Sequence, residues 1–175
     1  MNRRDSILLA ASKVVQQSGA EALTLEAVAQ AAGISKGGLL YHFPNKEALL
    51  KAMVAEMIAL FNTEIASELA AEDGPETGRW LRAYVRATLT EDSEFDAVTQ
   101  GLFAAFASNP DLLTPAREAA ALWQAQAQSD GLDPGLAATI RLAADGFWLS
   151  SLFGLEPTDP GHRASLRDFL LAMTR

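Results

Sequence analysis

The residues between positions 35 and 46 combine small, hydroxyl and cationic side chains in a pattern suited to binding phosphate. Two adjacent glycines, Gly37 and Gly38, fall inside a short predicted helix, where each costs about 1 kcal/mol of helix propensity relative to alanine. The missing side chains make sense if another molecule, such as the sugar-phosphate backbone of DNA, approaches this helix closely. Ser35 can cap the helix and offer its hydroxyl to a phosphate, because a helix N-terminus attracts anions. The side facing the duplex would carry further hydrogen-bond donors: Lys36, Tyr41, His42 and Lys46.

The elements that must position these residues follow a helix-turn-helix pattern. Apolar spacing predicts one helix over 25–32 and a second from 36 to about 42. Gly33 permits the turn between them, and Ile34 supplies the buried apolar contact that holds their crossing angle. Thr24 is expected to cap the first helix and could bind the neighbouring phosphate. The second helix would then enter a major groove.

Beyond the helix-turn-helix spacing, several specific residue segments occur within about the first 50 residues. They are Thr24-Leu25-Glu26-Ala27-Val28-Ala29, Ala32-Gly33-Ile34-Ser35-Lys36-Gly37, Leu39, and His42-Phe43-Pro44-Asn45-Lys46-Glu47-Ala48-Leu49. These segments resemble the DNA-binding signature of the tetracycline-repressor (TetR) family of bacterial transcription regulators. The resemblance implies a three-helix DNA-binding head on a helical body, working as a homodimer whose small-molecule ligand modulates its affinity for an operator.

One position departs from the family pattern. Where the family usually has a tyrosine, this chain has Leu40, so the phosphate-contacting hydroxyl assigned to that position is not expected here. Gly38 has no side chain and cannot contact a base edge, so fewer side chains remain for direct base recognition. Specificity is therefore expected to rest on Lys36, backbone contacts and DNA shape.

The composition excludes several classes of protein. With 175 residues, 49% of them apolar, the chain is long enough to bury roughly 70% of its unfolded surface without a metal or disulfide. The absence of cysteine excludes a disulfide framework, a thiolate nucleophile and a Cys-based zinc site. The two histidines, His42 and His162, argue against a His-rich metal site. No cofactor or metal is expected.

Charge divides the chain into two parts. The net charge is -8, which argues at first sight against a nucleic-acid partner. However, the first 51 residues carry six basic and four acidic side chains, whereas the rest carries 8 and 18. This split predicts two modules with different partners. We expect a helix-turn-helix DNA-binding domain over 1–48 and a helical ligand-binding and dimerisation domain over 49–175.

Helical periodicity predicts an all-α fold. A helix beginning at about residue 45 is expected to run toward the break at 73–75, with further helices over 76–90, 95–107, 110–129, 134–153 and 160–173. Asn109, Asp133 and Asp159 each precede a proline, a pairing typical of a helix start, while Pro115 marks either a kink or the true start of its helix. No run approaches the roughly 18 apolar residues of a membrane span, and no targeting signal is evident, so a cytoplasmic chain without a membrane partner is expected.

Several aromatic residues of the body could line a cavity for an apolar or aromatic effector, although such spacings are more often core. They are Trp80 with Tyr84, Phe103 with Phe106, Trp123, and Phe147. Asp145 lies in the apolar run 143–149, where a carboxylate is costly unless paired. It either pairs with Arg141 one turn earlier or anchors a cationic or hydrogen-bonding ligand.

The last two predicted helices are candidates for the dimer interface. Small residues on the first of them permit close helix approach, and an apolar stripe follows on the second. The resemblance implies that both helices pair with their twins in a four-helix bundle; alternatively, they close the core of the monomer. The candidate interface residues are Ser150, Ser151, Gly154, Leu166, Phe169 and Leu170.

Two other functional classes compete with a DNA-binding regulator, an enzyme and a protein-interaction module. The segment 33–37 matches the G-x-S-x-G motif of hydrolases, but a helix rather than a strand precedes it and no converging acid, base or metal group is visible, so an enzyme is not expected. A protein-interaction module would show no salt-dependent affinity for DNA. The favoured hypothesis is a homodimeric repressor released from a pseudo-palindromic operator by a small effector. The alternative is a DNA-binding regulator controlled by a protein partner or by no small molecule.

Overall fold

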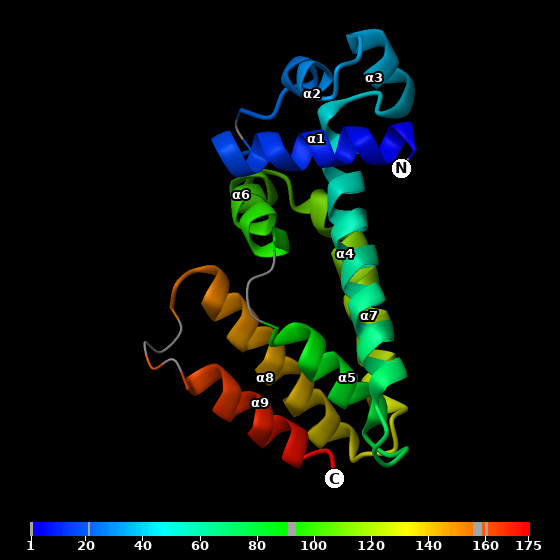
Figure 1. Cartoon of the computed structure of the whole chain (residues 1–175), viewed down its shortest axis with the longest axis vertical. Coiled ribbons are helices and arrows are strands. Elements are labelled where there is room, and N and C mark those ends of the chain that lie inside the picture. The colour runs from blue at the N-terminus through cyan, green and yellow to red at the C-terminus, as the bar shows by residue number, and fades with distance from the viewer. Residues whose placement is uncertain (1, 21, 91–93, 156–158, 160) are drawn as a thin grey trace. The chain divides into compact units, whose positions relative to one another are not determined.

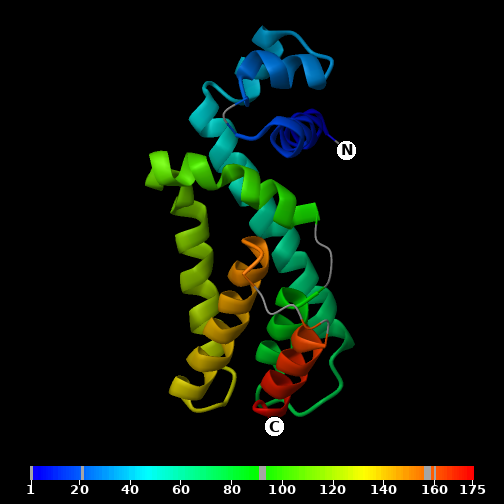
Figure 2. The same ribbon diagram turned by 90° about the vertical axis from the view of Figure 1, so that its left-hand side faces the viewer.

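A computed structural model describes residues 2–20, 22–90, 94–155, 159 and 161–175 (Figures 1 and 2). All of the regular structure within these residues is helical, with nine α helices and one short 3-10 helix. The all-α prediction is therefore confirmed. The chain divides into two compact units, one formed by residues 1–59 and 94–117 and the other by residues 60–93 and 118–175.

The first unit packs the N-terminal helices against a helix from the middle of the chain. Its apolar core joins the fully buried Ile7, Leu23, Leu39, Leu49 and Leu102. A side chain at Gly101 would overlap that of Val15, so glycine allows the middle helix to approach the first one closely. The elements of this unit are α1 (Arg3–Ser18), α2 (Leu25–Ala31), α3 (Lys36–His42), the first part of α4 (Lys46–Ala71), α6 (Glu94–Ser108), the 3-10 helix η1 (Pro110–Leu113) and the start of α7 (Thr114–Gln128).

The second unit is built around three helices that pack beside one another: α5 (Arg79–Thr88), α8 (Pro134–Leu152) and α9 (His162–Ala172) (Figure 1). The remaining parts of α4 and α7 complete it. Its main core includes Leu81 from α5, Ile140 from α8 and Leu170 from α9.

A buried ion-pair cluster in the second unit was not predicted from the sequence. Arg82 is buried and its Nε donates to Glu72 Oε1 at 3.0 Å, while Arg86 also donates to the Glu72 carboxylate. Arg82 Nη1 donates to the carbonyls of Thr77 at 2.9 Å and Thr174 at 3.3 Å, so one guanidinium connects the α4–α5 loop to the C-terminal residues. Burial opposes ionisation of Glu72, but hydrogen bonds from Arg86, the Gly74 N–H and Arg82 lower its pKa to about 2.

Helix starts that depend on a local cap were predicted well. Asn109 Oδ1 accepts from Asp111 N, and Asp133 Oδ1 accepts from the amides of 135 and 136. Pro115 lies in the first turn of α7, so it marks a start and not a kink. Pro160 lies outside the described residues, and α9 begins at His162 rather than at 160. Among the described helices, none has both the length and the apolar character needed to cross a membrane.

The start of α5 shows what local signals miss. The sequence predicted a helix over 76–90, whereas α5 spans Arg79–Thr88. Gly78 at its N-cap has a φ of 73° and provides no side-chain cap. Instead, the Asp130 carboxylate accepts from Trp80 N at 2.9 Å and from Leu81 N at 2.8 Å. A carboxylate distant in sequence therefore satisfies the first amides of this helix, where negative charge is favourable.

Candidate DNA-binding and ligand-binding sites

Two local caps set the geometry of the predicted helix-turn-helix. Thr24 Oγ1 accepts from Ala27 N at 3.1 Å at the start of α2, and Ser35 Oγ accepts from Gly38 N at 3.1 Å at the start of α3. Between the two helices Gly33 adopts a φ of +66°, a conformation that favours glycine. The boundaries of α3 are those the sequence predicted.

The surface of α3 is open apart from its inward side. Leu39 is fully buried in the core of the first unit, whereas Ser35 and Lys36 are exposed. A Cβ atom at Gly37 would meet no atom within 4 Å, so packing within the chain does not require glycine there. At Gly38 the Cβ would lie 3.3 Å from Ser35 Oγ, so this glycine also leaves room for the capping hydroxyl. Packing against the described residues therefore does not explain why position 37 is a glycine.

The donors predicted to face DNA have different surroundings. Tyr41 is 87% exposed and its ring stands edge-to-face against His42, with centroids 5.3 Å apart. Lys36 forms an exposed ion pair with Glu26 of α2. Lys46 Nζ donates to the Ala20 carbonyl at 3.0 Å in a partly buried position. The two lysines therefore have partners within the chain, whereas Tyr41 projects into solvent.

Three of the aromatic residues predicted to bind an effector lie together in the second unit. Trp80 stacks on Tyr84 with centroids 5.0 Å apart, and Trp123 of α7 lies 5.9 Å from Tyr84. Phe61 of α4 joins them, 5.1 Å from Trp123 and 5.5 Å from Tyr84. Trp123 Nε1 donates to Asn62 Oδ1 at 2.8 Å. We call Phe61, Trp80, Tyr84 and Trp123 the aromatic cluster.

Asp145 connects the aromatic cluster to a polar network. The Tyr84 hydroxyl donates to Asp145 Oδ1 at 2.6 Å, and Arg141 Nη1 donates to Asp145 Oδ2 at 2.7 Å. Arg141 Nε donates in turn to Gln124 Oε1 at 2.9 Å. The expected pair between Arg141 and Asp145 is present, so the carboxylate is already neutralised.

Burial governs the ionisation of this network. Burial raises the pKa of Asp145, while the Tyr84 hydroxyl and the Arg141 guanidinium act in the opposite direction. Burial together with the neighbouring carboxylate raises the pKa of Tyr84 far above its ordinary value. Tyr84 therefore remains a neutral hydrogen-bond donor, and the site can offer an aromatic surface beside an internal ion pair.

The remaining predicted effector residues lie elsewhere. Phe103 and Phe106 contact each other on α6 in the first unit, with centroids 5.9 Å apart. Phe147 is buried in the main core of the second unit, with the Arg163 guanidinium 5.4 Å from its ring centroid. Phe61 was missed, although its four-residue spacing from Ile65 continues the apolar stripe of α4.

The residues predicted at the dimer interface include both core and surface positions. Leu170 is buried in the main core and Leu166 is half-buried against it, whereas Phe169 is 63% exposed. Ser150 Oγ donates to the Gly146 carbonyl, Ser151 Oγ accepts from Arg163 Nη2 at 3.3 Å, and Gly154 has a φ of +64°. The exposed apolar residues Leu142 and Leu149 of α8, and Phe153 at its C-cap, were not predicted.

A capped helix, a glycine turn and a second capped helix with one buried side define a helix-turn-helix protein. Two family models match the same chain. Residues 7–53 match the bacterial regulatory proteins of the tetR family, and residues 78–175 match the tetracyclin repressor-like C-terminal domain. The chain belongs to the TetR family.

Individual relatives agree with this family. Over 59 residues the chain is 39% identical to the HTH-type transcriptional regulator RutR of Escherichia coli strain K12, covering 34% of this chain and 28% of that protein. A TetR-family member from Streptomyces coelicolor, SCO1917, is 26% identical with a TM-score of 0.74 and covers 100% of this chain and 99% of that chain. The multidrug binding protein EbrR, solved with imidazole, is 25% identical with a TM-score of 0.73, over 100% and 96% of the two chains. These relatives support the prediction of a regulator and not an enzyme.

Proposed function

We propose that this chain is a cytoplasmic transcriptional repressor that binds a pseudo-palindromic DNA operator as a homodimer and is released by a small apolar or aromatic effector. The observation that carries the DNA-binding part is the open surface of α3 around Gly37, where an added Cβ atom would meet no atom of the described residues within 4 Å. The surrounding residues offer phosphate and groove contacts: Thr24, Ser35, Lys36, Gly38, Tyr41, His42 and Lys46. In a dimer, two such helices would enter successive major grooves about 34–36 Å apart.

A binding assay on double-stranded DNA tests the DNA-binding part of this proposal. Duplexes selected from a random pool by the full chain are labelled, and their affinity is measured by fluorescence anisotropy over a range of salt concentrations. A repressor that neutralises phosphates gives a logarithmic affinity that falls linearly with the logarithm of salt concentration. An affinity that does not depend on salt would contradict the proposal and favour a protein-interaction module.

The exposed apolar side chains of α8 and α9 support the proposed homodimer. Leu142 and Leu149 of α8, Phe153 at the C-cap of α8 and Phe169 of α9 are all more than 40% exposed, and exposed apolar surface marks association sites. Replacing Phe169 by glutamate should shift the chain toward the monomer in analytical ultracentrifugation. The matched control is Leu122→Glu, since Leu122 of α7 is equally exposed and lies on another helix.

The aromatic cluster supports the proposed effector site, with Trp80, Tyr84, Trp123 and Asp145 as its main contacts. Phe103, Phe106 and Phe147 have weaker support, because they lie apart from these residues. EbrR is described as a multidrug binding protein and was solved with imidazole, so imidazole and larger aromatic fragments are suitable first probes. A fragment that binds the folded chain raises its melting temperature.

Release from the operator requires that the effector favour a dimer geometry with the wrong spacing between α3 helices. The coupling between effector and DNA would be about 1–3 kcal/mol. A fragment that raises the melting temperature of the wild type but not of Trp123→Ala supports the site. If fragments stabilise neither protein while salt-dependent DNA binding persists, the chain is a regulator without a small-molecule effector or one controlled by a protein partner.

A further inference from the structure

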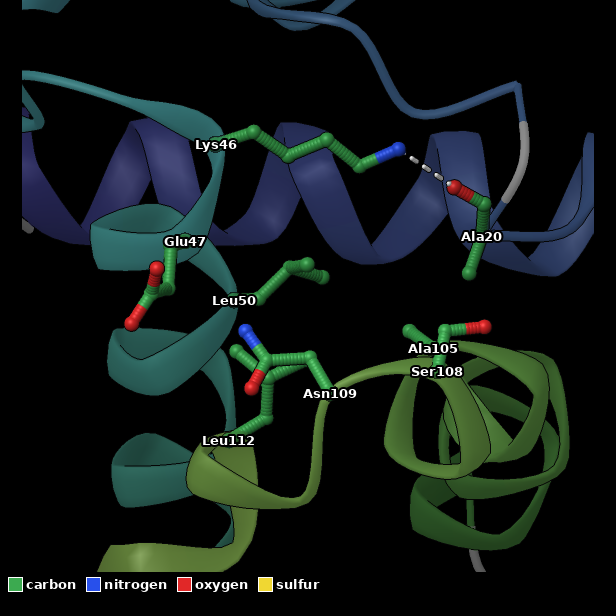
Figure 3. Close-up of a pocket in the computed structure, with 8 residues that line it drawn as sticks. All are labelled: Ala20, Lys46, Glu47, Leu50, Ala105, Ser108, Asn109 and Leu112. Carbon is green, nitrogen blue, oxygen red and sulfur yellow. Dashed lines mark hydrogen bonds between the residues drawn. The ribbon is translucent and has the colours of Figure 1, made fainter.

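A pocket of about 370 Å³ opens in the first unit, a volume within the range of small-molecule sites. None of its lining residues belongs to the proposed effector site. Its walls come from the residue segment after α1, the start of α4, the end of α6, and η1 (Figure 3). The lining residues are Ala20, Lys46, Glu47, Leu50, Ala105, Ser108, Asn109 and Leu112.

One side of the pocket is apolar. Leu50 of α4 and Leu112 of η1 are buried core residues of the first unit, and Ala105 of α6 lies next to them in the lining. Figure 3 shows the side chains of Leu50 and Leu112 between the ribbons of α4 and α6. Leu50 and Leu112 are only 4% and 2% exposed, so the apolar area that a ligand would cover there is small, but covering it still favours an apolar ligand body.

The cation among the lining residues is the ammonium of Lys46. Its Nζ donates to the Ala20 carbonyl, a neutral acceptor that satisfies one of its three donor hydrogens. Among the described residues, no carboxylate lies within ion-pair distance of this ammonium. A partly buried cation with a neutral partner favours an anion beside it.

The neighbouring acidic residues act on a different lysine. Glu47 Oε1 pairs with Lys51 Nζ at 2.7 Å, and Asp111 also interacts with the Lys51 charge. Figure 3 shows the Glu47 carboxylate and the Lys46 ammonium directed toward opposite sides of the view. Among the residues that the structure describes, Glu47 and Asp111 are therefore associated with Lys51, and Lys46 is the cation in the pocket lining.

We propose that this pocket is a second ligand site, which binds a small monocarboxylate with an apolar body. The body packs on Leu50 and Leu112, and the carboxylate accepts hydrogen bonds from Lys46 Nζ. A second consequence follows if Lys46 also contacts a DNA phosphate, as proposed above: ligand and DNA then compete for the same ammonium. The binding part does not depend on the proposed function, whereas the competition does.

Three probes separate charge from shape in a test of this site. Benzoate carries both an apolar ring and a carboxylate, benzamide has the ring without the charge, and acetate has the charge without the ring. Each is titrated into the ¹⁵N-labelled full chain, and backbone amide shifts are followed by NMR. We expect benzoate to give saturable shifts within residues 46–50 and 105–112, and to bind about tenfold more tightly than benzamide or acetate. Equal affinities for benzoate and benzamide, or shifts confined to other residues, would overturn the proposal.

Variants of Lys46 test whether its charge selects the ligand. Lys46→Met keeps most of the aliphatic stem and should reduce benzoate affinity to that of benzamide, while Lys46→Arg should retain the preference for the anion. Lys13→Met is the control, because Lys13 is an exposed lysine of α1 outside the pocket lining. The benzamide titration reports that the pocket of each variant is intact. Retention of the benzoate preference in Lys46→Met would contradict the assignment.

Competition with DNA is measured separately, on a selected duplex. Benzoate should weaken DNA binding by the wild type but not by Lys46→Met, at a sodium concentration matched in the benzamide arm with sodium chloride. If benzoate occupies the pocket and DNA affinity does not change, the competition is wrong although the site stands. If no variant binds DNA in a salt-dependent manner, the proposed function fails and the pocket titrations still decide the site.

Discussion

The surface of α3 and the aromatic cluster contrast in how the chain holds its candidate functional groups. On α3 the groups come from one short stretch, are fixed by hydrogen bonds between near neighbours, and project into solvent. In the aromatic cluster they come from α4, α5 and α7, contact one another, and continue into the partly buried Arg141–Asp145 ion pair. The first arrangement leaves these groups open to a partner outside the chain. The second is already satisfied within the chain, so any effector must replace contacts that exist without it.

The largest expected effect is a loss of DNA affinity on substitution in α3. A loss of folding stability instead would contradict the contrast drawn between α3 and the aromatic cluster. Gly37→Leu places a bulky side chain where the chain has open space, so folding and dimerisation should be unchanged. DNA binding should fall to the non-specific level, a loss of at least about 4 kcal/mol. Fluorescence anisotropy with a selected duplex measures the loss, and Gly37→Ala should give an intermediate affinity. Specific binding by Gly37→Leu would show that this helix does not approach DNA closely.

In the aromatic cluster the corresponding change should act on stability. Asp145→Ala removes the partner of Arg141, which is buried, and leaves its charge without an ion pair. We expect a loss of about 3 kcal/mol in the free energy of unfolding, measured by urea denaturation. The double variant Arg141→Met with Asp145→Leu removes both charges and should recover much of that loss.

The same double variant tests whether the ion pair of the aromatic cluster takes part in ligand binding. If the aromatic cluster is an effector site, the double variant should fold but no longer be stabilised by fragments that stabilise the wild type. If the fragments still raise its melting temperature to the same extent, the ion pair takes no part in ligand binding. A double variant as unstable as Asp145→Ala would show instead that the two side chains are needed for packing.

The contrast also explains how much the sequence could predict. The boundaries of α3 and the caps at Thr24 and Ser35 follow from residues three positions apart, so periodicity and cap preferences are sufficient. The membership of the aromatic cluster depends on which faces of α4, α5 and α7 meet, and spacing within one helix does not supply that. Phe61 was therefore missed, and Phe103 and Phe106 were grouped with residues of another unit.

Interactions distant in sequence were missed for the same physical reason. The cap that Asp130 provides to α5 joins residues about 50 positions apart, so a local sequence motif cannot predict it. The partner of Lys46 is a backbone carbonyl, which any residue type offers, so the sequence could indicate a cation but not its contact. Residue types and caps predict where a donor lies along its helix, whereas its partner depends on tertiary packing.

A pH experiment compares Glu72, which is buried, with Asp145, which is partly buried. The pKa of Glu72 is about 2 in the folded chain, below its ordinary value of 4.5, so its pairing stabilises the fold above pH 4.5. That contribution, about 2–3 kcal/mol, should be lost as the pH falls from 4.5 toward 2. Burial raises the pKa of Asp145, so its protonation favours the folded state and acts with the opposite sign.

The measurement is the difference in unfolding free energy between wild type and Glu72→Gln, at pH 7 and at pH 3. The difference should be large at pH 7 and should shrink at pH 3, where Glu72 is almost fully protonated in the unfolded chain. Glu64→Gln is the control, because Glu64 is an exposed glutamate of α4. A difference that does not change with pH would mean that the hydrogen-bonding shape of Glu72, and not its charge, holds Arg82 and Arg86.

The smallest expected effect concerns base recognition by the exposed apolar residues of α3. Leu40 is 36% exposed beside Tyr41, and an apolar side chain in a major groove can pack on the C5-methyl group of thymine. Burial of one methyl group contributes about 0.8 kcal/mol, so replacing the contacted thymidine by deoxyuridine should weaken binding about fourfold. Because only the methyl group is removed, phosphate contacts and the other hydrogen-bonding groups of the base are unchanged.

A double-mutant cycle assigns that methyl contact to Leu40. Each thymidine of a selected duplex is replaced in turn, and affinities are measured for wild type and Leu40→Ala. At one thymidine in each half-site, the substitution should weaken the wild type and leave Leu40→Ala unaffected, whereas Leu9→Ala, an exposed leucine of α1, should behave as wild type. Equal sensitivity in wild type and Leu40→Ala would remove Leu40 from the base contacts. Recognition by α3 would then rest on the backbone contacts and DNA shape that its paired glycines allow.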